Sequence, residues 1–527
     1  MTGKGSETLK LPLVRGAPDQ RLTVVGTLHF LALFLPHVLL VLPLRLLCSH
    51  LLFRRWSRVV QEVGRPALGQ LSMKVAQFIM SRLSVAQARI IFNGGFPYRL
   101  GQRIAPSYIS TVEVNGIKGL WLARPGTKRE DDDLVVFSVH GGGFFVDTGS
   151  NAQEFFLRSL KKLHAKHDLQ VSVFCLDYHL APEYKYPSQL IKVSAAYDYL
   201  VNTLGISEDK IVLSGDSAGG NLVTAFLLHL ARPAKAVSSA FQPSKQLRQS
   251  AGAFLISPFV DLASRRPSLS ANALYDCIDA GVAFRAACYY TGTTPPPSHA
   301  FTKVGLNPLW QFKLPDPGAP ATGEELHRLE GWGDVPGVEL FRDPYVNPAV
   351  CWDEEWWKEA MPGDGKTVVC WGGKEVLADD CEAFFEVLVK ADVKPEKLFK
   401  PLGVHDWLLH DYSAPGSWKS KSTGPDREFS FGLNSFCDFL ERIAGDRKKS
   451  APASVPTLDY LPTVDASNAP SSLAATSADA PPTFAAAAAS TDNVSKDAPI
   501  VVKGEGDVLS ASMGDSGVIV EKATEEK

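Results

Sequence analysis

The 527-residue sequence lacks several patterns that would point directly to a class of protein. Its eight cysteines are scattered without paired spacing, which excludes a cysteine-based zinc motif and argues against a disulfide framework in a chain of this length. One or two isolated disulfides stay compatible with the sequence, so the redox compartment is open. No basic patch interleaved with aromatic residues occurs, and a net charge of −3 gives no reason to expect nucleic acid as a partner.

Charged residues are also absent from residues 22–44, "LTVVGTLHFLALFLPHVLLVLPL". About 20 apolar helical residues cross a bilayer core, so this segment is long enough to span a membrane once. A cleavable signal peptide has a shorter apolar core and a small-residue cleavage site, which favours a retained anchor behind an N-terminal segment, residues 1–21. The alternative is a buried helix or an amphipathic helix at the membrane surface. Basic residues flank both sides, so the orientation stays open.

Large apolar residues are scarce at the other end of the chain. Residues 446–527 are rich in Ala, Ser, Pro and Asp, and such a composition cannot bury enough surface to offset the entropy of ordering. We therefore predict a disordered tail there. Residues 60–445 are left as the globular part of a chain whose 45% hydrophobic and 21% charged residues are ordinary.

Short apolar runs alternate with amphipathic stretches through this globular part, which predicts an α/β fold with a mostly parallel sheet flanked by helices. The predicted strands lie within "DDLVVFSVHGGG", "QVSVFCLDYHL", "DKIVLSGD", "AGAFLISPFVDL", "KTVVCWGGKE" and "EKLFKPLGVHDW". Two stretches do not fit: residues 62–100 read as amphipathic helices forming a cap, and residues 264–350 form an insertion rich in Pro, Gly and aromatics. Long insertions in compact domains are usually functional, so we expect both to wall a pocket.

The stretch "GDSAGG" matches the G-x-S-x-G nucleophile elbow. Gly215, Asp216 and Gly219 surround Ser217, and the glycines give the backbone room for a sharp turn that exposes the serine above the sheet. The helix that follows directs its N–H groups and positive dipole end at the same place. A predicted strand before the motif and a helix after it favour an elbow over an incidental serine in a glycine-rich turn.

The stretch "HGGGF" begins at His140, follows a predicted strand and precedes the elbow. Glycine N–H groups can approach a developing oxyanion without obstruction, and loss of one such donor costs about 100- to 1,000-fold in rate. Alone, the motif could be an ordinary loop or a phosphate cradle, but its order with the elbow favours an oxyanion hole. The expected donors are Gly142, Gly143 and Ala218, with His140 and Gly141 completing the motif.

A serine hydroxyl becomes a nucleophile only when a base takes its proton. Of the 12 histidines, His405 in "LGVHDW" follows the last predicted strand, in a loop that can reach the elbow, whereas His410 is expected to be structural. In the chain order Ser, acid, His, the acid follows a late strand. Glu375 in "WGGKEVLADD" occupies that loop and would accept the second imidazole N–H. Asp379 and Asp380 are expected at the start of the next helix.

The motifs "HGGGF", "DYHLAPEYKYP", "GDSAGGN" and "GVHDW" stand in the order found in the hormone-sensitive-lipase-like branch of the α/β-hydrolases, which the chain resembles over residues 130–440. In "DYHLAPE", His179 stands where the family has arginine; the block is expected to be structural, so the swap changes little. The family's acid begins a D-P-L-x-D segment, and "EVLAD" places Glu375 at that position. Glutamate serves the same role in many α/β-hydrolases. The resemblance implies an α/β-hydrolase fold.

An N-terminal anchor on such a domain resembles the fungal steryl acetyl hydrolases and the microsomal arylacetamide deacetylases. Both are anchored in the endoplasmic reticulum and remove small acyl groups from hydrophobic molecules. The resemblance implies a single-pass membrane esterase that releases short acyl groups, such as acetyl from steryl acetates, through an acyl-enzyme and without metal or cofactor. The alternatives are a lipase or amidase for longer chains and, in another class, a non-catalytic fold that binds apolar ligands. The exact substrate, the side of the membrane and the oligomeric state stay open.

The choice of Glu375 among three neighbouring carboxylates gives a direct test. Glu375→Gln is expected to lower kcat for a p-nitrophenyl ester by about 10⁴-fold, because the amide no longer holds the required imidazole tautomer. Asp379→Asn should keep near-full activity, since Asp379 is expected only at a helix start. Steady-state kinetics of the purified variants would measure both. The reverse pattern would assign the acid to Asp379.

Overall fold

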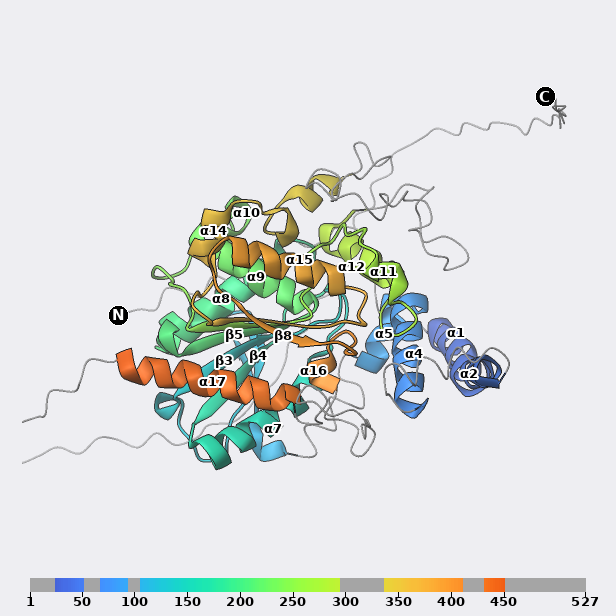
Figure 1. Ribbon diagram of the computed structural model, residues 1–527, viewed down its shortest axis with the longest axis horizontal. Coiled ribbons are helices and arrows are strands. Elements are labelled where there is room, and N and C mark those ends of the chain that lie inside the picture. Colours follow the sequence, from blue (N-terminus) through green and yellow to red (C-terminus); the bar gives the residue numbers. More distant parts are fainter. Residues whose placement is uncertain (1–23, 52–66, 93–104, 294–335, 411–430, 451–527) are drawn as a thin grey trace, which may run out of the picture. The chain divides into compact units, whose positions relative to one another are not determined.

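The computed structural model describes residues 24–51, 67–92, 105–293, 336–410 and 431–450 (Figure 1). Its eight-stranded sheet has the order β1-β2-β4-β3-β5-β6-β7-β8. β1 pairs antiparallel with β2 and β2 with β4, and all the other neighbours are parallel, so the predicted mostly parallel sheet is confirmed. The strands are β1 (Ile109–Val114), β2 (Ile117–Leu122), β3 (Leu134–Val139), β4 (Val171–Leu176), β5 (Ile211–Asp216), β6 (Gly252–Ile256), β7 (Thr367–Gly372) and β8 (Glu396–Lys400).

The antiparallel hairpin β1–β2 is missing from the strands expected from the sequence. Its two strands are joined by Asn115 and Gly116, whose φ angles are 50° and 76°. An Asn-Gly pair between alternating runs is the strongest short-range hairpin signal, because both central residues of the favoured turn need positive φ. The sequence therefore contains the turn signal of this hairpin, within "STVEVNGIKGLWL".

Helices cover both faces of the sheet (Figure 1). Val135, Phe137 and Val139 of β3 belong to one buried cluster with α8, α9 and α15, whereas Leu134 and Val136 belong to a second cluster with α7 and α17. Burial on both faces explains why the central strands read as unbroken apolar runs. The helices of these layers are α7 (Gly149–His167), α8 (Ser188–Asp198), α9 (Ala218–Ala231), α15 (Ala378–Lys390) and α17 (Phe431–Ser450).

Shorter elements connect these layers. They are α10 (Lys235–Ser238), α14 (Glu354–Ala360), α16 (Trp407–His410), the 3-10 turns η2 (Pro106–Tyr108), η3 (Arg129–Asp131), η5 (Glu208–Lys210), η7 (Val338–Arg342) and η8 (Pro348–Val350), and the π turn η4 (Tyr199–Thr203). Helix α17 continues to Ser450, so residues 446–450 are helical and the predicted start of the disordered tail at residue 446 is too early. The rest of that predicted tail lies outside the described residues.

The cap and the insertion pack against each other at one end of the sheet (Figure 1). Arg285 of the insertion donates to the carbonyls of Met80 and Leu83 in the cap, near a helix end where carbonyls have no intrahelical partner. Gln77 of the cap donates to the carbonyl of Ala273 at 2.9 Å. Their described helices are α4 (Ala67–Arg82) and α5 (Val85–Phe92) in the cap, and α11 (Ser268–Ala271) and α12 (Ala280–Thr291) in the insertion.

A long apolar helix precedes the cap. It consists of α1 (Val24–Pro36), a π turn η1 (His37–Val41) and α2 (Leu42–Leu51). Within it, Val24–Leu44 has a mean hydropathy of 2.1 with 6% of its most apolar stretch buried, and it is long enough to cross a membrane. A signal sequence near the N-terminus can also be long and apolar enough to form such a helix. One side packs on the cap: Phe30 is buried, and the rings of His37 and Phe78 stack at 3.7 Å.

Because helices bury both faces of the sheet, replacing a buried leucine by alanine should destabilise the fold more than replacing an exposed one. Leu190 in α8 and Leu204 after η4 provide such a pair. Leu190 has 0% exposure and Leu204 has 41%. Leu190→Ala should lower the free energy of unfolding by about 2–5 kcal/mol, because it removes buried methyl groups and leaves a cavity. Leu204→Ala should change it by less than about 0.5 kcal/mol. Urea unfolding of both variants would measure this, and equal costs would contradict the described core.

Candidate active site

Ser217 occupies the turn between β5 and α9, with φ 51° and ψ −117°. A non-glycine residue in this region costs on the order of 1–3 kcal/mol, and it persists only where the surroundings enforce it. Here close packing enforces it. A Cβ on Gly215 would overlap the carbonyl of Gly219, and a Cβ on Gly219 would overlap the carbonyl of Val139 in β3. The glycines of "GDSAGG" are therefore required by contact, and the serine is held in a strained turn.

The loop after β3 lies beside this turn. Gly142 and Gly143 have φ angles of 103° and 59°, and the preceding Gly141 donates its N–H to Asp216 Oδ2 at 3.0 Å. Within the described chain, the N–H groups of Gly142, Gly143 and Ala218 have no acceptor. Three free donors in two adjacent backbone turns are the components of an oxyanion hole.

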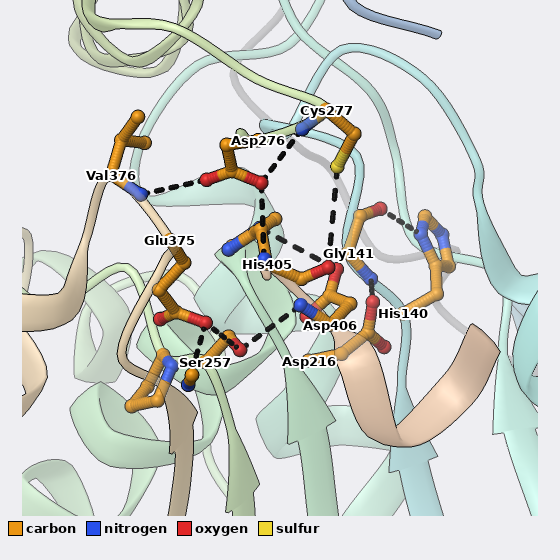
Figure 2. A network of polar contacts seen from close by, with 12 residues as sticks. His140, Gly141, Asp216, Ser257, Asp276, Cys277, Glu375, Val376, His405 and Asp406 are labelled. Atoms are coloured by element: carbon orange, nitrogen blue, oxygen red, sulfur yellow. Dashed lines mark hydrogen bonds and ion pairs between the residues drawn. The ribbon is translucent and has the colours of Figure 1, made fainter. Parts of the chain in front are cut away.

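His140 braces this loop from behind (Figure 2). Its Nδ1 lies 2.7 Å from the carbonyl of Gly141, and its ring stacks on Tyr178 at 4.2 Å. Tyr178 donates its hydroxyl to the carbonyl of His140 at 3.0 Å. Burial raises the pKa of Asp216 to about 6, and the hydrogen bond from the Gly141 N–H opposes this rise by stabilising the ionised carboxylate. The motif residues outside the donor set therefore serve to hold the loop.

Ser217, His405, Gly142 and Gly143 line one cavity of about 100 Å³. Most of the remaining wall is apolar and comes from the cap, the insertion and the loops around the sheet. These residues are Met73, Ala76, Met80 and Phe92 of the cap, Ile278, Val282, Ala283 and Ala286 of the insertion, and Phe259, Leu377 and Leu409. Both stretches expected to wall a pocket do so. His410, for which a structural role was expected, also lines the cavity.

The His405 side chain is buried, with 3% exposure. Burial, together with the nearby His410, lowers its pKa to about 3, so the imidazole is neutral at physiological pH and able to accept a proton. Nε2 lies 3.4 Å from Asp406 Oδ2, and Nδ1 has no hydrogen-bond partner among the described residues. In this structure the ring therefore faces Asp406, and neither nitrogen is bonded to Ser217 or Glu375.

Glu375 lies in the loop between β7 and α15 and has 0% exposure. Its Oε2 accepts from the Ser257 hydroxyl at 2.7 Å (Figure 2). The Gly372 N–H donates to the same oxygen at 3.1 Å, and the thiol of Cys381 is 3.6 Å from Oε1. Burial, followed by the charge of Asp276, raises the pKa of Glu375 to about 8. The Ser257 hydroxyl, the Gly372 N–H and the Cys381 thiol donate to the carboxylate and offset part of the cost of burying its charge.

Asp379 and Asp380 lie in the first turn of α15 as expected, but neither caps the helix. Asp379 accepts the N–H of Ser268 at 2.8 Å. Asp380 accepts the hydroxyl of Ser264 at 2.5 Å and lies 3.3 Å from Arg266. Both aspartates therefore bind residues of the insertion. Glu375, the third carboxylate of the cluster, instead bonds Ser257 and Gly372.

Sequence reasoning missed two polar residues of this site. Ser257, with φ 42° directly after β6, donates to Glu375 and accepts the N–H of Asp406 at 3.0 Å. Asp276 of the insertion accepts backbone N–H groups from the loops that contain Glu375 and His405 (Figure 2). Ser257 ends a predicted strand, which is a recognisable position for such a residue. Asp276 lies in no motif, and its role depends on how the insertion packs.

The sequence is similar to those of known hydrolases. A family profile described as "alpha/beta hydrolase fold" matches residues 136–311. The chain is similar to an esterase of Acinetobacter venetianus, with 26% identity over 286 residues, 54% of this chain and 70% of that protein. Hormone-sensitive lipase of Mus musculus is 34% identical over 164 residues, 30% of this chain and 20% of the lipase. Arylacetamide deacetylase-like 2 of Homo sapiens is 30% identical over 130 residues, 24% of this chain and 31% of that protein.

The sheet order and the profile match show that the chain has the α/β-hydrolase fold. Its relatives include hormone-sensitive lipase, an arylacetamide deacetylase-like protein and a bacterial esterase, so the predicted resemblance to the hormone-sensitive-lipase-like branch is confirmed. The matches to the two mammalian relatives span 20% and 31% of those proteins. These matches therefore indicate a shared domain. They do not assign the relatives' substrates to this chain.

The buried carboxylate predicts a pH-dependent stability. Glu375 titrates near pH 8 in the folded state, against about 4.3 for an ordinary glutamate in an unfolded chain. Between these values the folded state keeps a proton that the unfolded state has lost, so Glu375 lowers stability as pH rises through this range. Glu375→Gln removes the effect. Its stability relative to wild type should therefore rise from about pH 5 to pH 8 and then level off.

Urea unfolding of wild type and Glu375→Gln across this range would measure the difference. Glu386→Gln, at an exposed position on α15, is the matched control. A stability difference that stays constant with pH would show that Glu375 titrates normally in the folded protein.

Proposed function

We propose that this chain is a membrane-anchored serine ester hydrolase that removes short acyl groups from hydrophobic substrates. The observation that carries the proposal is one cavity that joins a strained Ser217, a neutral His405 and the unused N–H groups of the oxyanion loop. A nucleophile, a base and an oxyanion site are the minimum set for acyl transfer through a covalent intermediate.

In the proposed reaction, Ser217 Oγ attacks the acyl carbon while His405 takes the hydroxyl proton. The N–H groups of Gly142, Gly143 and Ala218 hold the tetrahedral oxyanion, and the proton passes to the leaving alcohol as the acyl-enzyme forms. A water molecule, activated by His405, then releases the acid. In its ionised form, Glu375 accepts the second imidazole N–H and stabilises the imidazolium, so this role requires Glu375 to lose the proton that burial favours.

The resting orientation of His405 adds one step to this scheme. Its ring faces Asp406 in the structure. For catalysis the ring turns so that Nε2 faces Ser217 and Nδ1–H faces Glu375. Catalytic hydrogen bonds often form fully only when substrate is bound, and side-chain rotations are fast compared with turnover.

The cavity is compatible with a hydrophobic substrate that carries a short acyl group. Its wall is mostly apolar, and its volume of about 100 Å³ is enough for an acetyl group beside Ser217. The rest of a larger substrate extends beyond this volume. The name of the relative arylacetamide deacetylase-like 2 is in keeping with removal of acetyl groups. Steryl acetates are proposed as substrates because of the resemblance of the anchored chain to steryl acetyl hydrolases.

The apolar helix supports the membrane part of the proposal. Val24–Leu44 is long enough to cross a bilayer, and Leu28, Leu39 and Leu40 are more than half exposed. Exposed leucines on one helix are costly in water and favourable in lipid. The proposed location is the endoplasmic reticulum membrane, in keeping with the resemblance to microsomal deacetylases.

The reaction and the acyl length can be tested together. Ser217→Ala should abolish labelling by a fluorophosphonate probe and lower kcat for p-nitrophenyl acetate by about 10⁶-fold, because the nucleophile is gone. In wild type, kcat/KM should fall from acetate and butyrate esters to long-chain esters. Ser214→Ala, a buried serine on β5, is the matched control and should keep both labelling and turnover.

The alternatives predict different results. Activity that rises towards long acyl chains would identify a lipase. Wild-type protein that neither labels nor turns over any ester would identify a non-catalytic fold that binds apolar ligands.

A further inference from the structure

One segment of the insertion, residues 272–278 between α11 and α12, lies against both loops that carry the proposed acid and base. Its Asp276 has 0% exposure and lies outside the cavity lining. Burial raises the pKa of Asp276 to about 6, so the group is an ionised carboxylate at neutral pH and can only accept hydrogen bonds. A buried carboxylate is tolerated only where several donors compensate its lost hydration. The identity of those donors shows what the residue does.

The first donor belongs to the acid loop. Val376, directly after Glu375, donates its N–H to Asp276 Oδ2 at 2.7 Å (Figure 2). The carbonyl of the same peptide group, that of Glu375, accepts the side-chain amide of Asn272 at 2.8 Å. Both polar atoms of the peptide that follows Glu375 are therefore bonded to segment 272–278. A peptide held at both ends cannot rotate, so the direction in which the Glu375 side chain leaves the backbone is set from the insertion.

The second donor belongs to the base loop. His405 donates its backbone N–H to Asp276 Oδ1 at 3.0 Å, and the N–H of Cys277 shares this oxygen at 2.7 Å. One carboxylate thus bonds the backbone of the proposed base through one oxygen and the residue after the proposed acid through the other. Along the chain, α15 and β8 separate residues 376 and 405. Outside Asp276, the two loops also meet where the Lys374 N–H donates to the carbonyl of Gly403 at 2.8 Å.

The cap holds the same segment from the opposite side. Lys74 and Gln77 of α4 donate to the carbonyl of Ala273 at 3.1 and 2.9 Å, and Gln77 also donates to the carbonyl of Ile278 at 3.1 Å. The same helix presents Met73, Ala76 and Met80 to the cavity. Segment 272–278 therefore lies between a helix that lines the cavity and the loops that carry the proposed acid and base.

We propose that Asp276, assisted by Asn272, is the positioning residue that aligns Glu375 and His405 with Ser217, and that it makes this alignment depend on the seating of the cap. The role rests on the proposed function of the same site. Asp276 reaches neither substrate nor the reacting atoms and acts through the backbone of the other two residues. A displacement of about 1 Å in such a group can cost about 100-fold in rate.

The test compares kcat and KM in the full chain for three variants. Asp276→Asn keeps an acceptor for His405 but places an amide NH₂ opposite the Val376 N–H, so it releases the acid loop; Asp276→Ala releases both loops. We expect kcat for p-nitrophenyl acetate to fall about 10-fold or more in Asp276→Asn and further in Asp276→Ala, with KM within about threefold of wild type. Asn272→Ala should show a smaller fall in kcat, because it removes only the amide bond to the Glu375 carbonyl.

Asp132→Asn is the matched control for loss of a buried carboxylate. Asp132 has 2% exposure and bonds Ser172 and Gln170 beside β3, away from the cavity. This variant should lose thermal stability but keep kcat. Wild-type kcat in folded Asp276→Asn and Asp276→Ala would overturn the proposal. If neither variant folds, Asn272→Ala decides: an unchanged kcat would overturn it, and a lower kcat with unchanged KM would support it.

The wild type separates this proposal from the function on which it rests. Wild-type protein without ester hydrolysis or fluorophosphonate labelling would refute the proposed function. Active wild type with equally active Asp276 variants would refute only the positioning role.

Discussion

The turn at Ser217 is the constraint on which the rest of the structure depends. β5 must reverse into α9 within one residue, at φ 51°, and this is possible only because Gly219 packs directly against the end of β3. The same contact brings the loop of Gly142 and Gly143 beside the serine, since that loop begins where β3 ends. The strain of the turn, on the order of 1–3 kcal/mol, is maintained by a core that is buried on both faces of the sheet.

Burial has opposite effects on the groups around the cavity. It keeps His405 neutral, with its pKa lowered to about 3, and it raises the pKa of Glu375 to about 8. The first effect suits a base and the second works against the ionised acid that a base requires. Ser257 and Gly372 offset part of this penalty by donating to Glu375, and Asp276 adds to it through its charge. A residue that raises this electrostatic cost yet holds two loops by their backbone is better explained by alignment than by stability.

Much of this fold could be predicted from the sequence, because the central strands are unbroken apolar runs and α/β alternation follows from them. The hairpin β1–β2 was missed although Asn115–Gly116 signals it. At the site, the glycine motifs placed Ser217 and its neighbours because a sharp turn needs particular residues in a fixed order. The contacts of Asp276 could not be predicted, since they join loops distant in sequence through an insertion without a motif. The orientation of the His405 ring depends on rotamer choice inside the cavity, which no local pattern specifies.

The central claim is that Ser217 carries the acyl group during turnover. Rapid mixing with p-nitrophenyl acetate, an acid quench and mass spectrometry of the digested protein would test it most directly. The account predicts a burst of p-nitrophenol no larger than the enzyme concentration and one acetyl group on the peptide that contains Ser217. Turnover without an acetylated peptide, or acetylation confined to another residue such as Ser257, would contradict it.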